Sequence, residues 1–231
     1  MKKLLSSLLI STLAMGSGVN AKDIQNPNNN PISFPGDYYS NESLGCLLLQ
    51  ECTDSVVEVT SRKDIEDYYG ETFNLPQEFE QILVELDKIG IKVFIAPESY
   101  FPTGHRGVYH TVSNNFYLND AFMHRSHVLM SVLRHEGWHA VQDCMAGSLD
   151  NNFIAVIHNE DDIPQLWKDM ARRTYPKHSL PWEQEASWAG RTENMTLNAL
   201  KACADEKPMW SFYEPTPFTR EWLVKEGYIT D

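Results

Sequence analysis

Apolar residues recur at helical spacing in the segment from Leu75 to Ile89, which reads LPQEFEQILVELDKI. Its apolar positions lie three and four residues apart, so they form one stripe on a helix, and Gly90 directly afterwards is a typical helix stop. The segment Ile91–Ala96 is short, rich in β-branched residues and followed by Pro97, as is typical of a strand. The pattern predicts a helix followed at once by a strand.

Two further apolar runs, Gly107–Val112 and Phe116–Leu118, flank a Ser-Asn-Asn turn and predict a hairpin. Ser126 is a favourable residue for a helix start, and the apolar residues from there to Met145 again keep helical spacing. Gly147 is expected to end this long helix.

Three more helices are expected in the rest of the chain. One covers about 163–173, a long one runs from Trp182 to about Ala204 with Pro181 in its first turn, and a short one lies near 219–226. The chain has no internal repeat or linker. It is therefore expected to have an α+β fold, with a short sheet packed on the long helix and on a later helix.

The first 21 residues have the pattern of a secretory signal peptide: two lysines, an apolar stretch, and small residues at Val19-Asn20-Ala21. A membrane anchor is the alternative, but a span needs roughly 20 apolar residues and this stretch has about a dozen. The sequence predicts an exported protein, periplasmic or secreted, without stable membrane insertion after signal cleavage. Residues 22–45 are expected to form an extended lead-in, and residues 46–231 a single domain.

The charge of the chain bears on its partners. Its 231 residues include 19 Lys and Arg against 32 Asp and Glu, a net charge of −13 that becomes −15 when the two lysines of residues 1–21 are removed. Nucleic acids and anionic membranes attract basic surfaces, so neither is an expected partner. The same excess predicts weak attraction for acidic peptides.

Four cysteines, Cys46, Cys52, Cys144 and Cys203, follow the signal segment, and an even number in an oxidising compartment favours disulfides. Three pairings are possible. The local pair Cys46–Cys52 leaves Cys144 with Cys203, while free buried thiols are the alternative. A zinc site made of cysteines is not expected, because the chain has no C-x-x-C pair.

The middle of the long helix carries His135-Glu136-Gly137-Trp138-His139, an H-E-x-x-H pattern. Histidines four residues apart lie one turn apart on one helix face, so both imidazoles can reach a single ion. Zinc held in this way keeps a position open for water, and Glu136 can then act as general base. The alternative is a helix with two surface histidines.

A zinc hydrolase site needs a third protein ligand, and the helix after Pro181 begins with two acids, Glu183 and Glu185. Here the chain resembles the gluzincin branch of the zincin metallopeptidases, in which a glutamate from a later helix completes the site. The resemblance implies Glu183, because Ala186 reproduces the E-x-x-A spacing. Glu185 remains the alternative ligand, and either acid could instead be a solvated carboxylate of the first helical turn.

The stretch HEGWHAVQ, residues 135–142, is also similar to small bacterial metallopeptidase domains, over roughly Leu75 to Ala204. The resemblance implies a zinc cofactor, a peptide or protein substrate, and a hairpin strand at Phe116–Leu118 beside the cleft that pairs with the substrate. His178 and Tyr175, which precede the glutamate helix, are candidates to donate a hydrogen bond to the oxyanion.

The sequence thus predicts an exported zinc metallopeptidase. The alternative is a non-catalytic, zincin-like binding or envelope-associated protein with a structural metal, for which a fourth protein ligand would be expected. In a third interpretation, the chain is an acidic exported scaffold without a metal, and Glu183 and Glu185 both lie far from His135.

Overall fold

The computed structural model of the chain describes residues 45–47, 52–111, 113–145, 154–175 and 179–205. The expected signal peptide, nearly all of the lead-in and the helix near 219–226 lie outside these residues. Among the described helices, none is long and apolar enough to cross a membrane.

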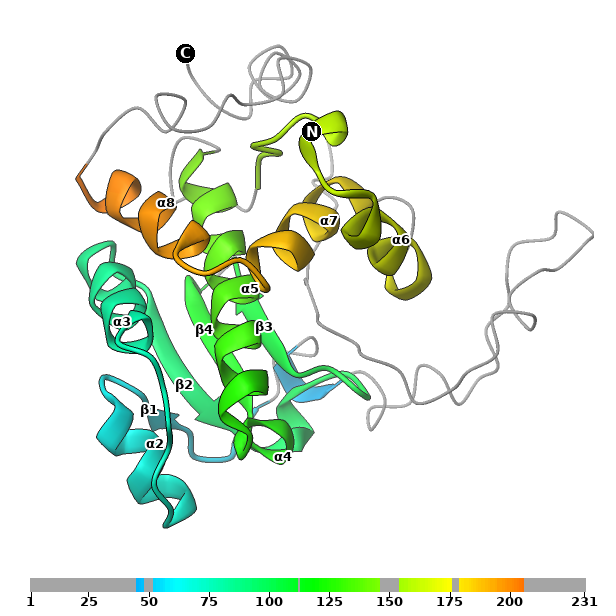
Figure 1. Cartoon of the computed structure of the whole chain (residues 1–231). Helices are drawn as coiled ribbons and strands as arrows, with labels where there is room; N and C mark the ends of the chain where they lie inside the picture. Colours follow the sequence, from blue (N-terminus) through cyan, green and yellow to red (C-terminus); the bar gives the residue numbers. More distant parts are fainter. Residues whose placement is uncertain (1–44, 48–51, 112, 146–153, 176–178, 206–231) are drawn as a thin grey trace, which may run out of the picture.

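One layer of the fold is a four-stranded sheet with the strand order β1-β2-β4-β3. Its strands are β1 (Val57–Glu58), β2 (Lys92–Ala96), β3 (Gly107–His110) and β4 (Asn115–Asn119). β2 and β4 are parallel, whereas β1 and β3 are antiparallel to their neighbours. The predicted strand and hairpin are confirmed, and β3 is an edge strand of the sheet (Figure 1).

The predicted helix before β2 is also confirmed, as α3 (Glu78–Lys88). Two shorter helices, α2 (Arg62–Tyr69) and α4 (Asp120–Met123), were not predicted. Together with the sheet, these helices and the longer ones that follow confirm the α+β fold class.

Helix α5 (Ser126–Met145) has the predicted bounds and lies at the centre of the fold. β3 and β4 contact one side of it, and the later helices α7 and α8 contact another (Figure 1). Of its 20 residues, 17 are buried. The polar residues in the middle of α5 therefore lie in the protein interior, where each needs a partner.

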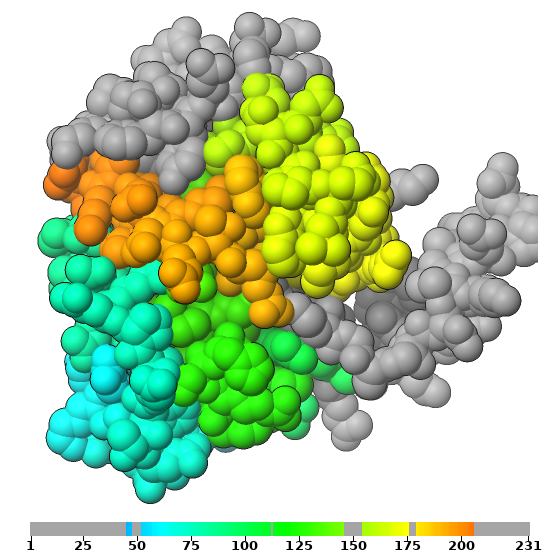
Figure 2. Space-filling view, in the orientation of Figure 1, coloured from blue at the N-terminus to red at the C-terminus, as the bar shows by residue number. Residues whose placement is uncertain are grey.

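The prediction of one long helix from Trp182 to Ala204 is wrong, because two helices occupy this segment: α7 (Leu180–Ala189) and α8 (Met195–Ala204). They follow α6 (Gln165–Thr174), which confirms the predicted helix at 163–173. In the space-filling view, α7 and α8 (orange) cover part of α5 and border α6 (yellow) (Figure 2).

Two contacts with other helices mark the break between α7 and α8. Gly190 packs so closely on α5 that a Cβ there would lie 3.0 Å from the carbonyl oxygen of Ser131. Asn194 adopts a left-handed conformation with φ 60°, and its N–H donates to Glu78 of α3 at 2.8 Å. Glu78 is buried and also accepts a hydrogen bond from Arg134 of α5, so one carboxylate fixes the start of α8 against two other helices.

Both expected disulfides are present, Cys46–Cys52 and Cys144–Cys203, and none of the four cysteines is free. The second bond joins the C-terminal turn of α5 to α8 across 59 residues of sequence, whereas the first spans only 6. A cross-link that closes a longer loop removes more conformational entropy from the unfolded chain.

We therefore expect loss of the Cys144–Cys203 bond, in the double variant Cys144→Ser/Cys203→Ser, to lower the free energy of unfolding by roughly 4 kcal/mol. The matched variant Cys46→Ser/Cys52→Ser should lower it by roughly 2 kcal/mol, because its loop is short. Equilibrium unfolding in guanidinium chloride measures both values. A larger loss for the short loop would contradict the expected order.

Candidate metal centre

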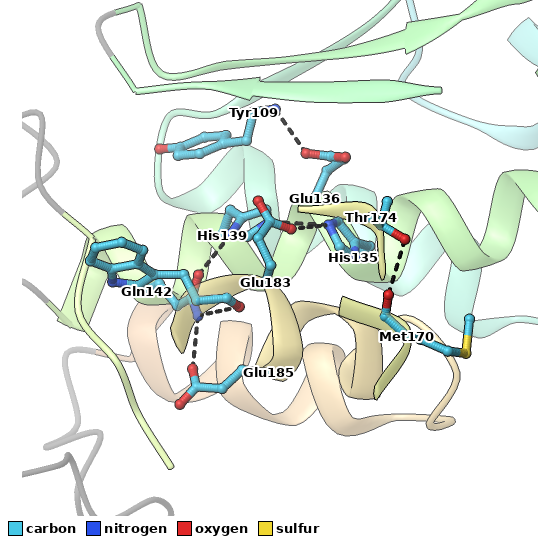
Figure 3. Close-up of polar contacts among 10 residues, drawn as sticks. Tyr109, His135, Glu136, His139, Gln142, Met170, Thr174, Glu183 and Glu185 are labelled. Atoms are coloured by element: carbon cyan, nitrogen blue, oxygen red, sulfur yellow. Dashed lines mark hydrogen bonds and ion pairs between the residues drawn. The ribbon is translucent and has the colours of Figure 1, made fainter. Parts of the chain in front are cut away.

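Three side chains from two helices meet beside the middle of α5. His135 and His139 extend from α5, and Glu183 extends from the first turn of α7 (Figure 3). The Nε2 atoms of the two histidines lie 3.2 Å apart. Glu183 Oε2 lies 3.3 Å from Nε2 of His135 and 3.8 Å from Nε2 of His139.

These separations fit the ligands of one small metal ion. Two nitrogens bound to zinc at about 2.0–2.1 Å in tetrahedral geometry lie about 3.3 Å apart. The His135–His139 distance matches this spacing, and the ligand atoms of all three residues lie within 4.8 Å of one another. Among the described residues, no fourth His, Cys, Asp or Glu side chain joins the group.

Burial sets the charge state of the two histidines. His135, His139 and Glu183 are each at most 1% exposed. Burial lowers the pKa of His139 to about 4, and burial together with the nearby His139 lowers the pKa of His135 well below its ordinary value. Both imidazoles are therefore neutral at neutral pH, which is the form that binds a metal.

Glu136 turns from the same helix towards β3 (Figure 3). Its Oε2 accepts a hydrogen bond from the backbone N–H of Tyr109 at 2.9 Å, while its Oε1 is buried and has no hydrogen-bond partner among the described residues. Burial raises the pKa of this carboxyl well above its usual value, and the Tyr109 N–H opposes that shift. A divalent cation nearby would also favour the ionised form.

Strand β3 can approach Glu136 because Gly107 has no side chain. A Cβ at this position would lie 2.5 Å from Cγ1 of Val132 and 3.0 Å from Cγ of Glu136, closer than packed side chains allow. Tyr109 holds the strand there at a second point, because its hydroxyl donates to Asp143 of α5 at 2.8 Å. Glycine at 107 and tyrosine at 109 therefore keep the edge strand against the site.

The strand expected to border the cleft was Phe116–Leu118, and this expectation is wrong. That segment belongs to β4, which lies between β2 and β3 and pairs with both. Since β4 uses its backbone groups inside the sheet, the strand with a free edge beside Glu136 is β3.

Glu185 is not part of the His–Glu group, which leaves Glu183 as the acid that faces the two histidines. Residues two apart on a helix point in nearly opposite directions. Glu185 is fully buried, so it is not a solvated carboxylate either. It accepts four hydrogen bonds, from Gln142 Nε2 (2.7 Å), Trp138 Nε1 (3.3 Å) and the backbone N–H groups of Ile157 (2.8 Å) and His158.

Gln142 connects Glu185 to His139. Its Nε2 faces two acceptors, Glu185 Oε2 and the carbonyl oxygen of Trp182, so its Oε1 is the atom 2.7 Å from His139 Nδ1. An amide oxygen only accepts, so His139 donates from Nδ1 and its Nε2 lone pair is directed at Glu183 and His135. The hydrogen bonds from Glu185 through Gln142 to His139 thus orient the imidazole of His139 for metal binding (Figure 3).

Tyr175, one of the two candidates for oxyanion stabilisation, lies at the site; His178 is outside the described residues. The Tyr175 ring is nearly parallel to that of His135, with 6.4 Å between the ring centroids. Burial, followed by the charges of Glu183 and Glu136, raises the pKa of its phenol well above the ordinary value. The hydroxyl therefore stays protonated and can donate a hydrogen bond.

Reasoning from the sequence did not single out Gln142 or Tyr109. Gln142 follows His139 by three residues on a helix, so the spacing could have identified it as a neighbour. Tyr109 is 27 residues away from Glu136 and acts through its backbone, so no side-chain pattern could have identified it.

Comparisons with known proteins yield no relative: the chain matches no protein-family model, no curated protein and no solved structure.

We expect Glu183→Gln to weaken zinc binding far more than Glu185→Gln does. The first change removes a ligand atom, whereas the second disturbs only Gln142, the hydrogen-bond partner of His139; loss of such a partner costs about 10–100-fold in affinity. Competition with a chromophoric chelator measures both dissociation constants. Glu193→Gln changes an exposed carboxylate just after α7 and should have no effect; a Glu185→Gln loss as large as that of Glu183→Gln would contradict the assignment.

Proposed function

We propose that the protein is an exported, zinc-dependent metallopeptidase of the gluzincin type. The observation that carries the proposal is the meeting of two histidines and Glu183 at the spacing of zinc ligands. Catalytic zinc sites commonly use three protein ligands and keep the fourth position for water, and two histidines with one glutamate are a known set. The zinc assignment rests on these donor types and on their separations.

Glu136 is the proposed general base. Bound zinc supplies Lewis acidity and activates water towards a peptide carbonyl. Glu136 receives the proton of the attacking water on Oε1, the oxygen without a protein hydrogen bond, and returns it to the leaving amine. The Tyr109 N–H occupies Oε2, so Oε1 is the oxygen left without a protein hydrogen bond.

Tyr175 is the proposed oxyanion donor. Its phenol lies beside His135, and its pKa is raised by burial and by the two carboxylates of the site, so the phenol is protonated. A donor fixed before the reaction stabilises negative charge that develops on the carbonyl oxygen of the substrate.

The free edge of β3 is the proposed binding surface for the substrate backbone. The N–H of Tyr109 points away from β4 and is taken by Glu136. Peptide groups alternate in direction along a strand, so the backbone groups of Gly107 and the carbonyl oxygen of Tyr109 are directed to the same edge. An extended peptide can add there as a further strand beside Glu136.

Export completes the proposal. The two disulfides favour an oxidising compartment, and the pattern of residues 1–21 supports secretion to the periplasm or beyond the cell.

The competing function is that of a non-catalytic binding or envelope-associated protein with a structural metal. Burial of all three ligands favours it, because a closed site excludes substrate. A structural zinc site, however, commonly has four protein ligands, whereas three donors gather among the described residues. Oε1 of Glu136 is buried without a hydrogen-bond partner, which fits a catalytic role of this carboxylate better than a structural role.

Glu136→Gln should abolish peptide hydrolysis and leave zinc bound. The amide cannot accept the proton, and loss of a general base costs about 10²–10⁴-fold in rate. Cleavage of a casein or peptide library, together with zinc content by atomic absorption, measures both properties. Full zinc-dependent cleavage by this variant would refute the mechanism, and a wild-type protein that binds zinc but cleaves nothing would favour the structural alternative.

Tyr175→Phe should lower kcat by roughly 10²-fold with little change in KM, because the variant keeps the ring beside His135 and loses only the hydroxyl that stabilises the transition state. Tyr68→Phe is a control, since Tyr68 is an exposed tyrosine that donates to Asp120. Steady-state kinetics on one peptide tests the role; an unchanged kcat would exclude it.

A further inference from the structure

Two adjacent residues in the last turn of α5 reach the candidate metal centre. Oε1 of Gln142 accepts a hydrogen bond from Nδ1 of His139 at 2.7 Å, which orients this imidazole. Asp143 accepts a hydrogen bond from the hydroxyl of Tyr109 at 2.8 Å, and the backbone N–H of Tyr109 donates to Glu136 at 2.9 Å. A metal ligand and the proposed general base therefore both depend on the position of this turn.

The turn is the end of a helix, so its own hydrogen bonds do not fix it. The last four carbonyl groups of a helix have no partner within the helix, and helix ends fray. α5 ends at Met145, so Gln142 and Asp143 both lie among its last four residues. The carbonyl oxygen of Gln142 accepts from the N–H of Ala155 at 2.9 Å, which is a contact from outside the helix. Tertiary contacts must therefore hold the turn in place.

A covalent contact lies in the same turn. Cys144 directly follows Asp143, and its disulfide joins the turn to Cys203 of α8. Residues two apart on a helix point in nearly opposite directions, so Cys144 faces away from the side on which Gln142 meets His139. The disulfide thus holds the turn from the α8 side, opposite the metal centre (Figure 1).

Helix α8 is a firm support for this bond, because its start is also fixed on α5. The hydroxyl of Thr196 donates to the carbonyl oxygen of Arg134 at 2.8 Å. The Thr196 side chain packs on Gly137, where a Cβ would lie only 2.9 Å from its Cγ2 atom. α8 is therefore attached to α5 near Arg134 and again at Cys144, and the whole H-E-x-x-H motif lies between these two points.

We propose that the Cys144–Cys203 disulfide is a positioning element of the metal centre: it holds the turn of α5 whose side chains orient a histidine ligand and the edge strand β3. The inference rests on the zinc centre of the proposed function and does not require peptide hydrolysis. A disulfide commonly stabilises a protein through its effect on the unfolded chain. The positioning role acts in the folded protein, so it changes zinc affinity as well as the free energy of unfolding.

The test compares the zinc dissociation constants of the wild type, Cys144→Ala/Cys203→Ala and the matched control Cys46→Ala/Cys52→Ala, by competition with a chromophoric chelator. Trimethylamine N-oxide in every sample keeps the variants folded, as near-ultraviolet circular dichroism checks. Loss of a group that orients a metal ligand weakens binding by about 10–100-fold. We therefore expect about tenfold weaker binding in the first variant and no change in the control. Equal affinity of the first variant and the wild type would overturn the positioning role and leave the zinc and peptidase proposals intact.

A double-mutant cycle with Gln142→Leu identifies the route of the effect. Leucine keeps a similar volume and removes both hydrogen bonds of the amide, so this change alone should weaken zinc binding by about 10–100-fold. If the disulfide acts through Gln142, its removal from the Gln142→Leu protein causes no further loss of affinity. Losses that add would show that the disulfide acts on zinc by another route, which contradicts the proposal.

Hydrogen exchange in the zinc-free protein tests the contact with β3 separately. The amide of Tyr109 is protected by its hydrogen bond to Glu136. We expect this protection to be lost in Cys144→Ala/Cys203→Ala, and also in Tyr109→Phe, which lacks the hydroxyl that binds Asp143. Asp143→Asn keeps an acceptor and should retain the protection. Unchanged exchange of this amide in the disulfide variant would refute the positioning of β3, whether or not the protein is a peptidase.

Discussion

Burial of ionisable side chains in the middle of α5 is the constraint on which the rest of the structure depends. The helix is covered by the sheet on one side and by α7 and α8 on another, so His135, Glu136 and His139 cannot be solvated where they lie. Each of these groups meets a group from another part of the fold or from the next helical turn: the edge strand reaches Glu136, Gln142 reaches His139, and Glu183 faces both histidines. The same burial that makes these groups costly keeps the imidazoles neutral and concentrates the attraction for a cation.

The features of the fold and of the site that could be predicted from the sequence are those set by the local periodicity of apolar residues or by a choice among few possible pairings. The bounds of α5, the hairpin and the two disulfides are of this kind, and so is the pairing of His135 with His139 on one helix face. The choice between Glu183 and Glu185 is different, because both lie in the same helix and only the packing of α7 on α5 decides which one faces the histidines.

The sequence-based predictions are wrong where residues that are distant in the sequence determine the conformation of a segment. The chain could have remained helical from Trp182 to Ala204, but a close approach at Gly190 and a hydrogen bond to Glu78, 116 residues away, separate α7 from α8. Likewise, nothing within Phe116–Leu118 reveals that β2 pairs with it in parallel and moves it from the edge to the interior of the sheet. Strand order is a property of the whole sheet and cannot be obtained from one strand.

Glu185 also gives the segment that begins at Ile154 an influence on the candidate metal centre, which this segment reaches only through hydrogen bonds. One oxygen of this carboxylate holds the backbone at Ile157 and His158, and the other holds the amide that orients His139. A displacement of that backbone would pull on the carboxylate and rotate the imidazole away from Glu183. The orientation of His139 thereby depends on the path of a buried segment that does not contact it.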